Sequence, residues 1–445
     1  MELKRVYMLG IGGIGMSALA RYYHSQGVEV SGYDRTPSPL TKQLENEGMA
    51  IHYEDNPNLL PALIDTVVFT PAVPQELQEM VELRRRGIPM MKRSEALGEV
   101  TKSHFTIAVA GTHGKTTTTA LVAHILKENG IDMTAFIGGI ANNFNSNIHL
   151  GRTPEAVIVV EADEFDRSFL HLSPDISIVN SIDADHLDIY GDKHQVEEGF
   201  NAFARLTHRC VIVKEGLPID VEEAVLHNFG FNEQNSYRAV NVQQHEGETD
   251  FDIEYLDTTV HVHLNMAGTH NVLNATAAFA AVFELGLEAD DIAAAMATFK
   301  GVRRRFDVRV KNDRHVYIDD YAHHPEEIKS CLSAIKASFP SKRLTLVFQP
   351  HLFTRTRDFM DDFAKSLAMA DDLILLDIYP AREKPIEGIN SQALLDKTNM
   401  ASKCLCTKEQ LLDTLEDRKP ELVVTMGAGD IDRFVEPLEK RISQW

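Results

Sequence analysis

The sequence predicts an α/β protein of three domains, at residues 1–99, 100–300 and 301–445. A chain of 445 residues is too long for one ordinary hydrophobic core. Twice, an apolar stretch of strand length leads through a glycine-rich turn into a helical pattern, and beyond residue 300 strands and helices alternate again. A hydrophobic content of 44% with 25% charged residues is ordinary for globular proteins, so the composition favours a folded chain.

The chain is strongly acidic, with 66 acidic against 44 basic residues and a formal net charge of -22. Such a charge opposes binding to nucleic acid and to anionic membranes. A nucleotide with its Mg²⁺ stays compatible, because its site needs only local positive charge and aligned backbone N–H groups. We therefore expect small-molecule partners, with no nucleic acid and no membrane, while monomer and homodimer both stay open.

Cysteine usage and the N-terminal residues favour an intracellular protein. The cysteines are too few and too scattered for a disulfide framework or a paired zinc site: Cys210, Cys331, Cys404 and Cys406. Residues 6–20 form an apolar run behind two basic residues, as in a secretory signal, but four glycines between positions 10 and 15 would break its helix. No other stretch approaches the roughly 20 apolar residues of a membrane span. The sequence therefore predicts a cytoplasmic protein.

The first domain opens with a strand, a glycine-rich turn and a helix. Val6–Leu9 is apolar, a turn with four glycines follows, and Met16–Gln26 has a helical pattern. Val28–Ser31 is expected to form the next strand, with Asp34 just beyond it. The glycine spacing fits G-x-G-x-x-G, in which a diphosphate approaches the backbone at a helix N-terminus and an acid holds a ribose hydroxyl. A tight turn without a ligand is the alternative.

The second domain begins with the same arrangement and a more specific loop. The apolar strand Thr106–Ala110 leads into Gly111–Thr118, of sequence GTHGKTTT, and a helix runs from Lys115 to Asn129. Backbone N–H groups of such a loop cradle phosphates, its lysine contacts the β- and γ-phosphates, and the hydroxyl of Thr116 would ligate Mg²⁺. The strict pattern has a glycine where this chain has Val109, so the loop is a shortened variant. The sequence predicts an ATP site here.

Acidic residues and a histidine follow the next two apolar strands. Glu161 ends the run that starts at residue 156, where a carboxylate reaches a metal at the carboxyl edge of a parallel sheet. Asp163 and Glu164 are either further metal ligands or capping and solvated acids. The strand at residues 176–179 is followed by NSIDADHLD, whose His186 is a candidate second metal ligand, although nineteen histidines make chance clusters common.

The hydrophobic pattern changes in the rest of the second domain. Residues 210–213 form a further apolar strand, and residues 236–265 alternate between polar and apolar, which predicts an antiparallel appendage. Helical patterns cover residues 270–285 and 290–299. The basic cluster that follows is expected to be a hinge, with Arg303 and Arg304 solvated and Arg305 directed at the γ-phosphate, as arginine acts in phosphoryl transfer.

The third domain repeats strand and helix. Strands are expected at 316–318, 343–348, 373–376 and 421–426, and helices at 325–339 and 359–370. Two strand ends carry polar residues, in the segments IDDYAHHP and FQPHLFTRTR, and strand ends that converge commonly form a pocket. Capping for Asp320 and a core position for Tyr321 are the alternatives.

Taken in order, several motifs resemble those of the Mur ligases of peptidoglycan precursor synthesis: GTHGKTTT, EADEFD, NSIDADHLD, GTHNVLNATAA, GVRRRFD and DDYAHHP. The resemblance covers essentially the whole chain. The segments GIGGIGMS, FQPHLFTRTRDF and IYPAREKPIEG resemble the branch that adds L-alanine to UDP-N-acetylmuramate. The family implies a Rossmann-like domain for the UDP-sugar, a central ATPase and a Rossmann-like domain for the amino acid. It also implies a reaction through an acyl phosphate.

The resemblance gives roles to individual residues. It implies that Lys115, Glu161, His186 and Arg305 are the catalytic group, and that Thr116, Glu161 and His186 bind Mg²⁺. The nucleotide would contact Gly111, Thr112, His113, Gly114, Lys115, Thr116, Thr117, Asn271, Asn274, Arg305 and Asp320. The UDP-sugar would contact Gly10, Gly12, Gly13, Gly15 and Asp34. The amino-acid end would be formed by Tyr321, His323 and Arg355.

Two departures from the family pattern matter. Several Mur ligases have a carbamylated lysine where this chain has Phe200, which excludes that device and suits the alanine-adding branch. Many relatives have arginine where this chain has Leu352, so the binding of a substrate carboxylate falls more heavily on Arg355.

Three alternative functions stay open from the sequence. A recycling ligase that attaches an intact tripeptide to the same UDP-sugar shares the phosphate loop. A nicotinamide-dependent dehydrogenase fits the first domain, but nothing in the chain supplies hydride chemistry. An ATP-driven switch would hydrolyse ATP without any muramate substrate.

Overall fold

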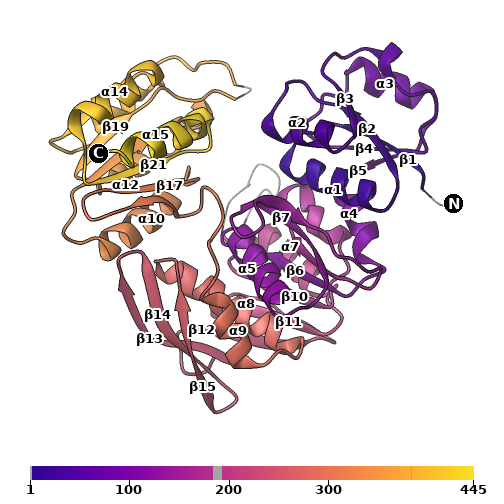
Figure 1. The fold of residues 1–445 in the computed structure, drawn as a ribbon, viewed down its shortest axis with the longest axis horizontal. Coiled ribbons are helices and arrows are strands. Elements are labelled where there is room, and N and C mark those ends of the chain that lie inside the picture. The colour runs from indigo at the N-terminus through magenta and orange to yellow at the C-terminus, as the bar shows by residue number, and fades with distance from the viewer. Residues whose placement is uncertain (1–2, 184–192, 382) are drawn as a thin grey trace. The chain divides into compact units, whose positions relative to one another are not determined.

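The computed structural model describes residues 3–183, 193–381 and 383–445 (Figure 1). The chain divides into two compact units. The first comprises residues 1–240, 252–260 and 273–299, and the second comprises residues 241–251, 261–272 and 300–445. The division therefore passes through the region of alternating sequence around residue 250.

The first sheet of the first unit is parallel, in the order β3-β2-β1-β4-β5. Its strands are β1 (Arg5–Leu9), β2 (Glu29–Tyr33), β3 (Ala50–His52), β4 (Thr66–Phe69) and β5 (Met90–Lys92). The connecting helices are α1 (Ile14–Ser25), α2 (Pro39–Asn46), η1 (Pro57–Leu59), α3 (Gln78–Arg85) and α4 (Arg93–Thr101). The strand order reverses between β1 and β4, and ligands of such sheets bind at the carboxyl edge beside that point. The glycine-rich turn after β1 lies there.

The second sheet has the order β15-β14-β13-β12-β11-β10-β6-β9-β7-β8. Its parallel strands are β6 (Thr106–Ala110), β7 (Met133–Ala141), β9 (Val157–Glu161), β10 (Ile176–Val179), β11 (Cys210–Lys214) and β12 (Val225–Gly230), and β8 (Ser146–His149) is antiparallel to β7. The helices are α5 (Lys115–Glu128), η2 (Phe165–His171), α7 (Lys193–Ala204), α8 (Thr269–Glu284) and α9 (Ala289–Met296). Strand β6, which carries the phosphate loop, again lies where the order reverses, between β9 and β10.

The alternating segment forms β13 (Tyr237–His245), β14 (Glu248–Tyr255) and β15 (Thr258–Leu264), joined by two-residue turns. Both residues of each turn have positive φ: Glu246 (50°) with Gly247 (89°), and Leu256 (44°) with Asp257 (60°). This conformation matches the twist of adjacent antiparallel strands, so the turns close two hairpins. The predicted antiparallel appendage is therefore present.

Apolar side chains of both sheets of the first unit belong to one buried cluster. It includes Met8 and Leu19 from the first sheet and its helix, and Ala108 and Val160 from the second. Tyr22 on α1 lies 5.5 Å, ring centre to ring centre, from Phe136 on β7. The glycine-rich turn and the phosphate loop are therefore held on elements that share a core.

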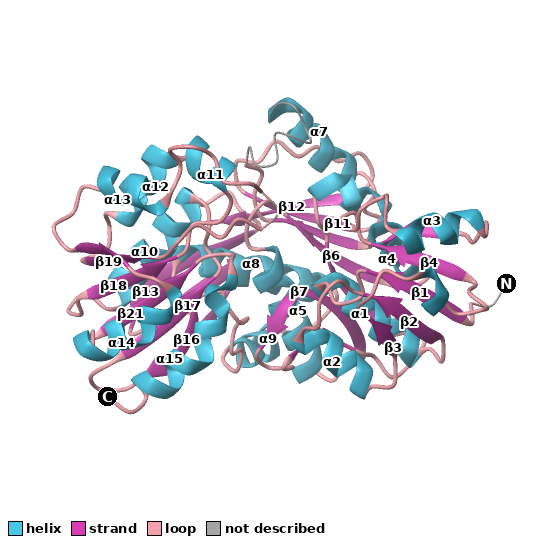
Figure 2. Cartoon of the chain, turned by 90° about the horizontal axis from the view of Figure 1, so that it is seen from above, coloured by secondary structure: helices cyan, strands magenta, loops and turns pink. Residues whose placement is uncertain are grey.

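The sheet of the second unit has the order β16-β17-β21-β18-β19-β20, with helices on both faces (Figure 2). Its strands are β16 (Asp307–Lys311), β17 (Val316–Asp320), β18 (Leu344–Phe348), β19 (Asp372–Leu375), β20 (Lys403–Leu405) and β21 (Leu422–Met426). Helices α10 (Pro325–Ser338), α11 (Phe353–Asp358), α12 (Met360–Leu367), α13 (Ser391–Lys397), α14 (Lys408–Arg418), η3 (Asp430–Phe434) and α15 (Val435–Ile442) connect them. In register, Met426 lies between Asp320 and Phe348. The polar segments after β17 and β18 thus leave the same edge.

Among the helices of the described ranges, none is both long and apolar enough to span a membrane.

Candidate active site

The phosphate loop is shaped by glycines with positive φ. Gly111 has a φ of +137° and Gly114, the residue before α5, has a φ of +82°. A Cβ at Gly114 would collide with the side-chain oxygen of Asn274 and lie 3.0 Å from the amide nitrogen of Asn180. Only glycine combines this conformation with this close approach. The backbone therefore turns sharply into α5, whose first N–H groups have no partner within the helix.

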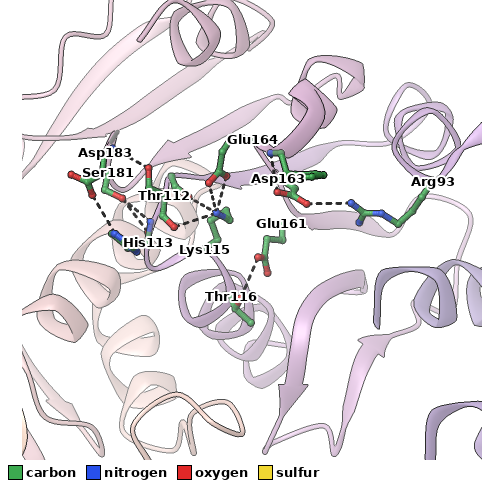
Figure 3. A network of polar contacts seen from close by, with 12 residues as sticks. Arg93, Thr112, His113, Lys115, Thr116, Glu161, Asp163, Glu164, Ser181 and Asp183 are labelled. Atoms are coloured by element: carbon green, nitrogen blue, oxygen red, sulfur yellow. Dashed lines mark hydrogen bonds and ion pairs between the residues drawn. The ribbon is translucent and has the colours of Figure 1, made fainter. Parts of the chain in front are cut away.

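The segment after β10 braces the loop (Figure 3). Ser181 accepts hydrogen bonds from the N–H of Thr112 through its carbonyl, at 3.1 Å, and from the N–H of His113 through its hydroxyl, at 2.8 Å. The hydroxyl of Thr112 in turn accepts from the N–H of Asp183, whose carboxylate lies 3.4 Å from Nε2 of His113. These contacts hold Thr112 and His113, two of the predicted nucleotide residues, in place within the loop.

Lys115 forms a buried ion pair with Glu164. Its Nζ lies 3.0 Å and 2.7 Å from the two carboxylate oxygens, and it also donates to the carbonyl of Gly111 at 2.6 Å. The side chains are 13% and 5% exposed. Burial alone would lower the pKa of Lys115, but the charges of Glu164 and Glu161 outweigh it and raise the pKa above its ordinary value. The lysine thus stays charged at neutral pH, and Glu164 is its partner.

Thr116 and Glu161 present oxygen atoms to one point beside the loop. The hydroxyl of Thr116 donates to Oε1 of Glu161 at 3.2 Å, and Oε2 of Glu161 accepts from the N–H of Gly138 at 3.0 Å. Mg²⁺ is held in proteins by one or two such oxygens together with substrate phosphates and water. The described residues hold no cluster of three His, Cys, Asp or Glu side chains that would make a complete metal site. Two oxygens at one point are the kind of ligands that Mg²⁺ takes alongside phosphate and water, so the pair fits that ion.

His186, the other predicted metal ligand, lies outside the described residues, so its role stays a prediction. Phe200, which the resemblance aligns with a modified lysine of several relatives, lies on α7. Its ring is fully buried and packs edge to face on Phe169 at 5.3 Å. This residue is part of the core.

The two asparagines of α8 differ in their surroundings. The side-chain oxygen of Asn274 adjoins Gly114 in the phosphate loop. The side-chain amide of Asn271 donates to the carbonyl of Ala267 at 2.8 Å, so it bonds the backbone just before its own helix begins. Asn274 is thus placed at the loop, whereas the adenine contact of Asn271 stays a prediction. Thr117, the last predicted loop contact, is 7% exposed in the first turn of α5.

The glycine-rich turn after β1 brings its predicted residues together. Gly10 has a φ of +78°, and Gly13 is the residue before α1. The N–H of Gly12 donates to Oδ2 of Asp34 at 2.8 Å, so the acid lies against the turn. Gly15 is in the first turn of α1, and the guanidinium of Arg93 lies beside it. Arg93 was missed in the sequence because it lies far from the glycines along the chain.

In the second unit, Asp320 ends β17 and is buried. Its carboxylate accepts from the N–H groups of Phe306 at 2.6 Å and Ala322 at 2.7 Å, whereas the residue that caps the following helix α10 is His324. Burial raises the pKa of Asp320, and these hydrogen bonds oppose that shift. The guanidinium of Arg305 lies 5.0 Å from the ring centre of Tyr321. Tyr321 is intermediate in burial, so it is not a core residue.

The prediction that Arg304 is solvated is wrong. Its side chain is 20% exposed and lies 3.5 Å from the carboxylate of Asp319, which is itself buried. Burial raises the pKa of Asp319 to about 7, although Arg304 acts against that shift. The guanidinium also lies 5.1 Å from the ring centre of Tyr321. The positive charge of Arg304 offsets the cost of burying the carboxylate of Asp319.

Aromatic rings and histidines gather after β17 and β18. His323 lies 5.1 Å from Tyr321 and 6.1 Å from His351, measured between ring centres, and His351 stacks on Tyr379 at 5.8 Å. Burial and then the charge of Arg355 lower the pKa of His323, with Glu327 opposing them. His351 and Tyr379 were not singled out in the sequence, although the family segments that contain them were.

Leu352 has a backbone conformation that is rare for its type. Its φ is +71°, in the region that favours glycine, and its N–H donates to the carbonyl of Tyr379 at 2.9 Å. Such strain in a non-glycine residue persists only where the surrounding contacts hold it, and it gathers at functional sites. The residue opens α11, on which Arg355 lies.

His351 provides a test through the pH dependence of stability. Burial, His323 and Arg355 lower its pKa from 6.5 to about 4, so the folded protein keeps it neutral where the unfolded chain takes up a proton. The stability that it contributes is complete above pH 6.5 and is lost as the pH falls to about 4. We expect His351→Asn to lose less stability than the unchanged protein between pH 7 and pH 5, measured by urea unfolding. Identical losses would contradict this assignment.

Family models match three consecutive parts of the chain. Residues 5–105 match the model described as Mur ligase family, catalytic domain. Residues 109–282 match the Mur ligase middle domain, and residues 304–429 match the Mur ligase, glutamate ligase domain.

Curated relatives and solved structures match along the whole chain. A UDP-N-acetylmuramate–L-alanine ligase from Christiangramia forsetii is 46% identical, with 99% of this chain and 98% of the relative covered. One from Flavobacterium johnsoniae is 47% identical, with 100% and 99% covered. The crystal structure of UDP-N-acetylmuramate-alanine ligase from Thermotoga maritima is 29% identical, covers both chains completely and has a TM-score of 0.83. A murein peptide ligase from Psychrobacter arcticus, 23% identical with 99% of both chains covered and a TM-score of 0.72, shares the fold.

With a phosphate loop of this form, three consecutive family matches and relatives of nearly half-identical sequence over their full length, the chain belongs to the Mur ligase family.

Proposed function

We propose that the protein joins L-alanine to the carboxylate of UDP-N-acetylmuramate at the expense of ATP. The products are UDP-N-acetylmuramoyl-L-alanine, ADP and phosphate, and the reaction belongs to peptidoglycan synthesis in the cytoplasm. The observation that carries this proposal is the identity of 46% to 47% with ligases of this name, over essentially the full length of both chains.

The reaction has two steps. A carboxylate oxygen of the sugar attacks the γ-phosphorus of ATP, the bond from that phosphorus to its bridging oxygen breaks, and ADP leaves. The amine of L-alanine then attacks the carbonyl carbon of the acyl phosphate, phosphate leaves, and the nitrogen loses a proton. The first step brings two anions together, so the protein must supply positive charge where they meet. The second step needs water to be excluded from the acyl phosphate.

The geometry of the phosphate loop supports these roles. The N–H groups at the start of α5 bind phosphate oxygens, and Lys115 moves from Glu164 to the β- and γ-phosphates of ATP. Thr116 and Glu161 would hold Mg²⁺, which would neutralise phosphate charge when bound. Asn274 and Ser181 keep the loop in place. The loop thus provides a charged lysine and aligned donors before the nucleotide arrives.

The remaining assignments follow from the family resemblance. We assign Arg305, Asp320 and Asn271 to the nucleotide, His186 to Mg²⁺, and Tyr321, His323 and Arg355 to L-alanine. The glycine-rich turn, with Gly10, Gly12, Gly13, Gly15 and Asp34, takes the UDP-sugar. The protein acts as a monomer or homodimer, without nucleic acid or membrane.

A substrate screen tests this proposal. ADP release is measured with ATP, Mg²⁺ and UDP-N-acetylmuramate in the presence of L-alanine, glycine, L-serine or the tripeptide of a recycling ligase. We expect release that depends on both the UDP-sugar and the amino acid, and that is fastest with L-alanine. Activity with the tripeptide alone would replace the proposal with the recycling reaction. ATP turnover without any UDP-sugar would favour an ATP-driven switch.

A further inference from the structure

The guanidinium of Arg93 lies against the glycine-rich turn. Arg93 begins α4 directly after β5, and the side chain of Glu95 fixes this helix start by accepting from the N–H of Lys92 at 2.6 Å. A Cβ built on Gly15 would lie only 2.7 Å from Nη1 of Arg93. The absence of a side chain at Gly15 is thus what lets the guanidinium reach the first turn of α1.

This arrangement places two positive charges side by side. The N-terminus of a helix carries partial positive charge on its unpaired N–H groups, and the first turn of α1 has no acidic residue. An arginine beside such a terminus is repelled by it unless an anion lies between them or close by. Asp163 supplies such an anion, because its Oδ2 lies 3.3 Å from Nη2 of Arg93 (Figure 3).

The pair between Arg93 and Asp163 is open to exchange. The two side chains are 25% and 37% exposed, so solvent and ligands reach both. The contact is a single hydrogen bond at 3.3 Å, whereas a phosphate offers arginine two parallel ones. Asp163 also accepts from the N–H of Phe165 at 3.1 Å, so its charge keeps a partner if Arg93 turns away. Exchange for a doubly charged ligand is therefore electrostatically favourable.

Asp163 stands next to Glu164, and each holds one cation. Glu164 pairs with Lys115 of the phosphate loop, and Asp163 pairs with Arg93 beside the glycine-rich turn. Two adjacent carboxylates after β9 thus each hold a cation that lies in or beside one of the two glycine-containing loops.

We propose that Arg93 binds the diphosphate of the UDP-sugar, with the N–H groups of the glycine-rich turn on the other side of the same group. This inference rests on the proposed function, which puts the UDP-sugar at that turn. Asp163 holds the guanidinium in place until the diphosphate replaces it. Arg93 is then a substrate-binding residue, and Asp163 is a positioning residue that competes with the substrate.

Calorimetric titration with UDP and UDP-N-acetylmuramate, without ATP, tests the contact. We expect Arg93→Ala to weaken both by about ten- to a hundredfold, the usual effect of losing a charged hydrogen-bonded contact, and Arg93→Lys to weaken them less. Uridine, which lacks the diphosphate, is followed by its NMR signals and should bind the unchanged protein and Arg93→Ala within about twofold of each other. The matched control is Lys102→Ala, which removes an exposed positive charge from the end of the same helix.

Asp163→Asn separates binding from a structural role. If Asp163 competes with the ligand, this variant binds UDP as tightly as the unchanged protein or more tightly. If the ion pair only holds the domain in shape, Asp163→Asn and Arg93→Ala weaken UDP binding alike, and the inference is overturned. It is also overturned if Arg93→Ala binds UDP normally.

Steady-state kinetics gives a second readout. Arg93→Ala should raise the KM for UDP-N-acetylmuramate and leave the KM for ATP within about twofold. A rise in the KM for ATP alone would contradict the assignment. If the unchanged protein does not bind UDP-N-acetylmuramate at all, the proposed function fails together with this inference. If the unchanged protein binds it and the Arg93 variants bind it equally well, only the inference about Arg93 fails.

Discussion

Lys115→Ala should abolish measurable ATP-dependent ligation, with a loss of at least about a hundred- to a thousandfold in kcat. The lysine is the charged side chain of the phosphate loop, and its pKa is raised, so no other protonation state competes. The substitution also breaks the buried ion pair of Lys115 with Glu164, which lowers the free energy of unfolding by about 3 to 5 kcal/mol. Both effects are measured, by phosphate release and by urea unfolding.

The two effects of this substitution can be separated. The double variant Lys115→Ala with Glu164→Gln removes both charges of the buried ion pair, so it should recover most of the stability and none of the activity. Binding of UDP-N-acetylmuramate to either variant should stay near normal, because the glycine-rich turn lies on another sheet. Loss of UDP-sugar binding together with catalysis would show that this separation is mistaken.

Glu161→Gln should raise the concentration of Mg²⁺ that the reaction needs. The amide keeps the size of the side chain but loses the charge that would attract the metal, and it can no longer accept hydrogen bonds at both oxygens from Thr116 and Gly138. We expect kcat/KM to fall about a hundredfold at millimolar Mg²⁺ and to recover in part as Mg²⁺ is raised. The measurement is phosphate release over a Mg²⁺ titration.

Thr116 supplies the matched control for the metal. Thr116→Ser keeps the hydroxyl and should retain a Mg²⁺ dependence close to that of the unchanged protein, whereas Thr116→Ala should shift it toward higher Mg²⁺. If Glu161→Gln lowers activity equally at every Mg²⁺ concentration, the carboxylate serves the structure of the loop and does not bind the metal.

The phosphate loop was predictable because its signal is local. Strand β6, the glycines and the start of α5 at Lys115 are set by neighbouring residues, and the structure places all three where the sequence predicts them. Strand β7 was not predicted, since Gly138 and the glycine after it interrupt its apolar pattern although the strand continues through them.

Charge partners were not predictable in the same way. Lys115 pairs with Glu164 and Arg93 pairs with Asp163 across 49 and 70 positions of the chain. Which acid meets which base depends on the packing of helices on sheets, and sequence spacing carries no signal for that. The same reason made Arg304 look solvated, because its buried partner Asp319 comes from β17, further along the same domain.

The buried cluster that both sheets of the first unit share bears on how Mur ligases can exchange parts in evolution. A recombination joint near residue 100 would transplant one sheet without the apolar side chains that complete its interior, such as Phe136 against Tyr22. Exchange between relatives is therefore expected to keep the UDP-sugar and nucleotide modules together as one inherited block. Within that block, substitutions of buried apolar residues on one sheet are expected to be matched by substitutions on the other, while the outer loops are free to diverge.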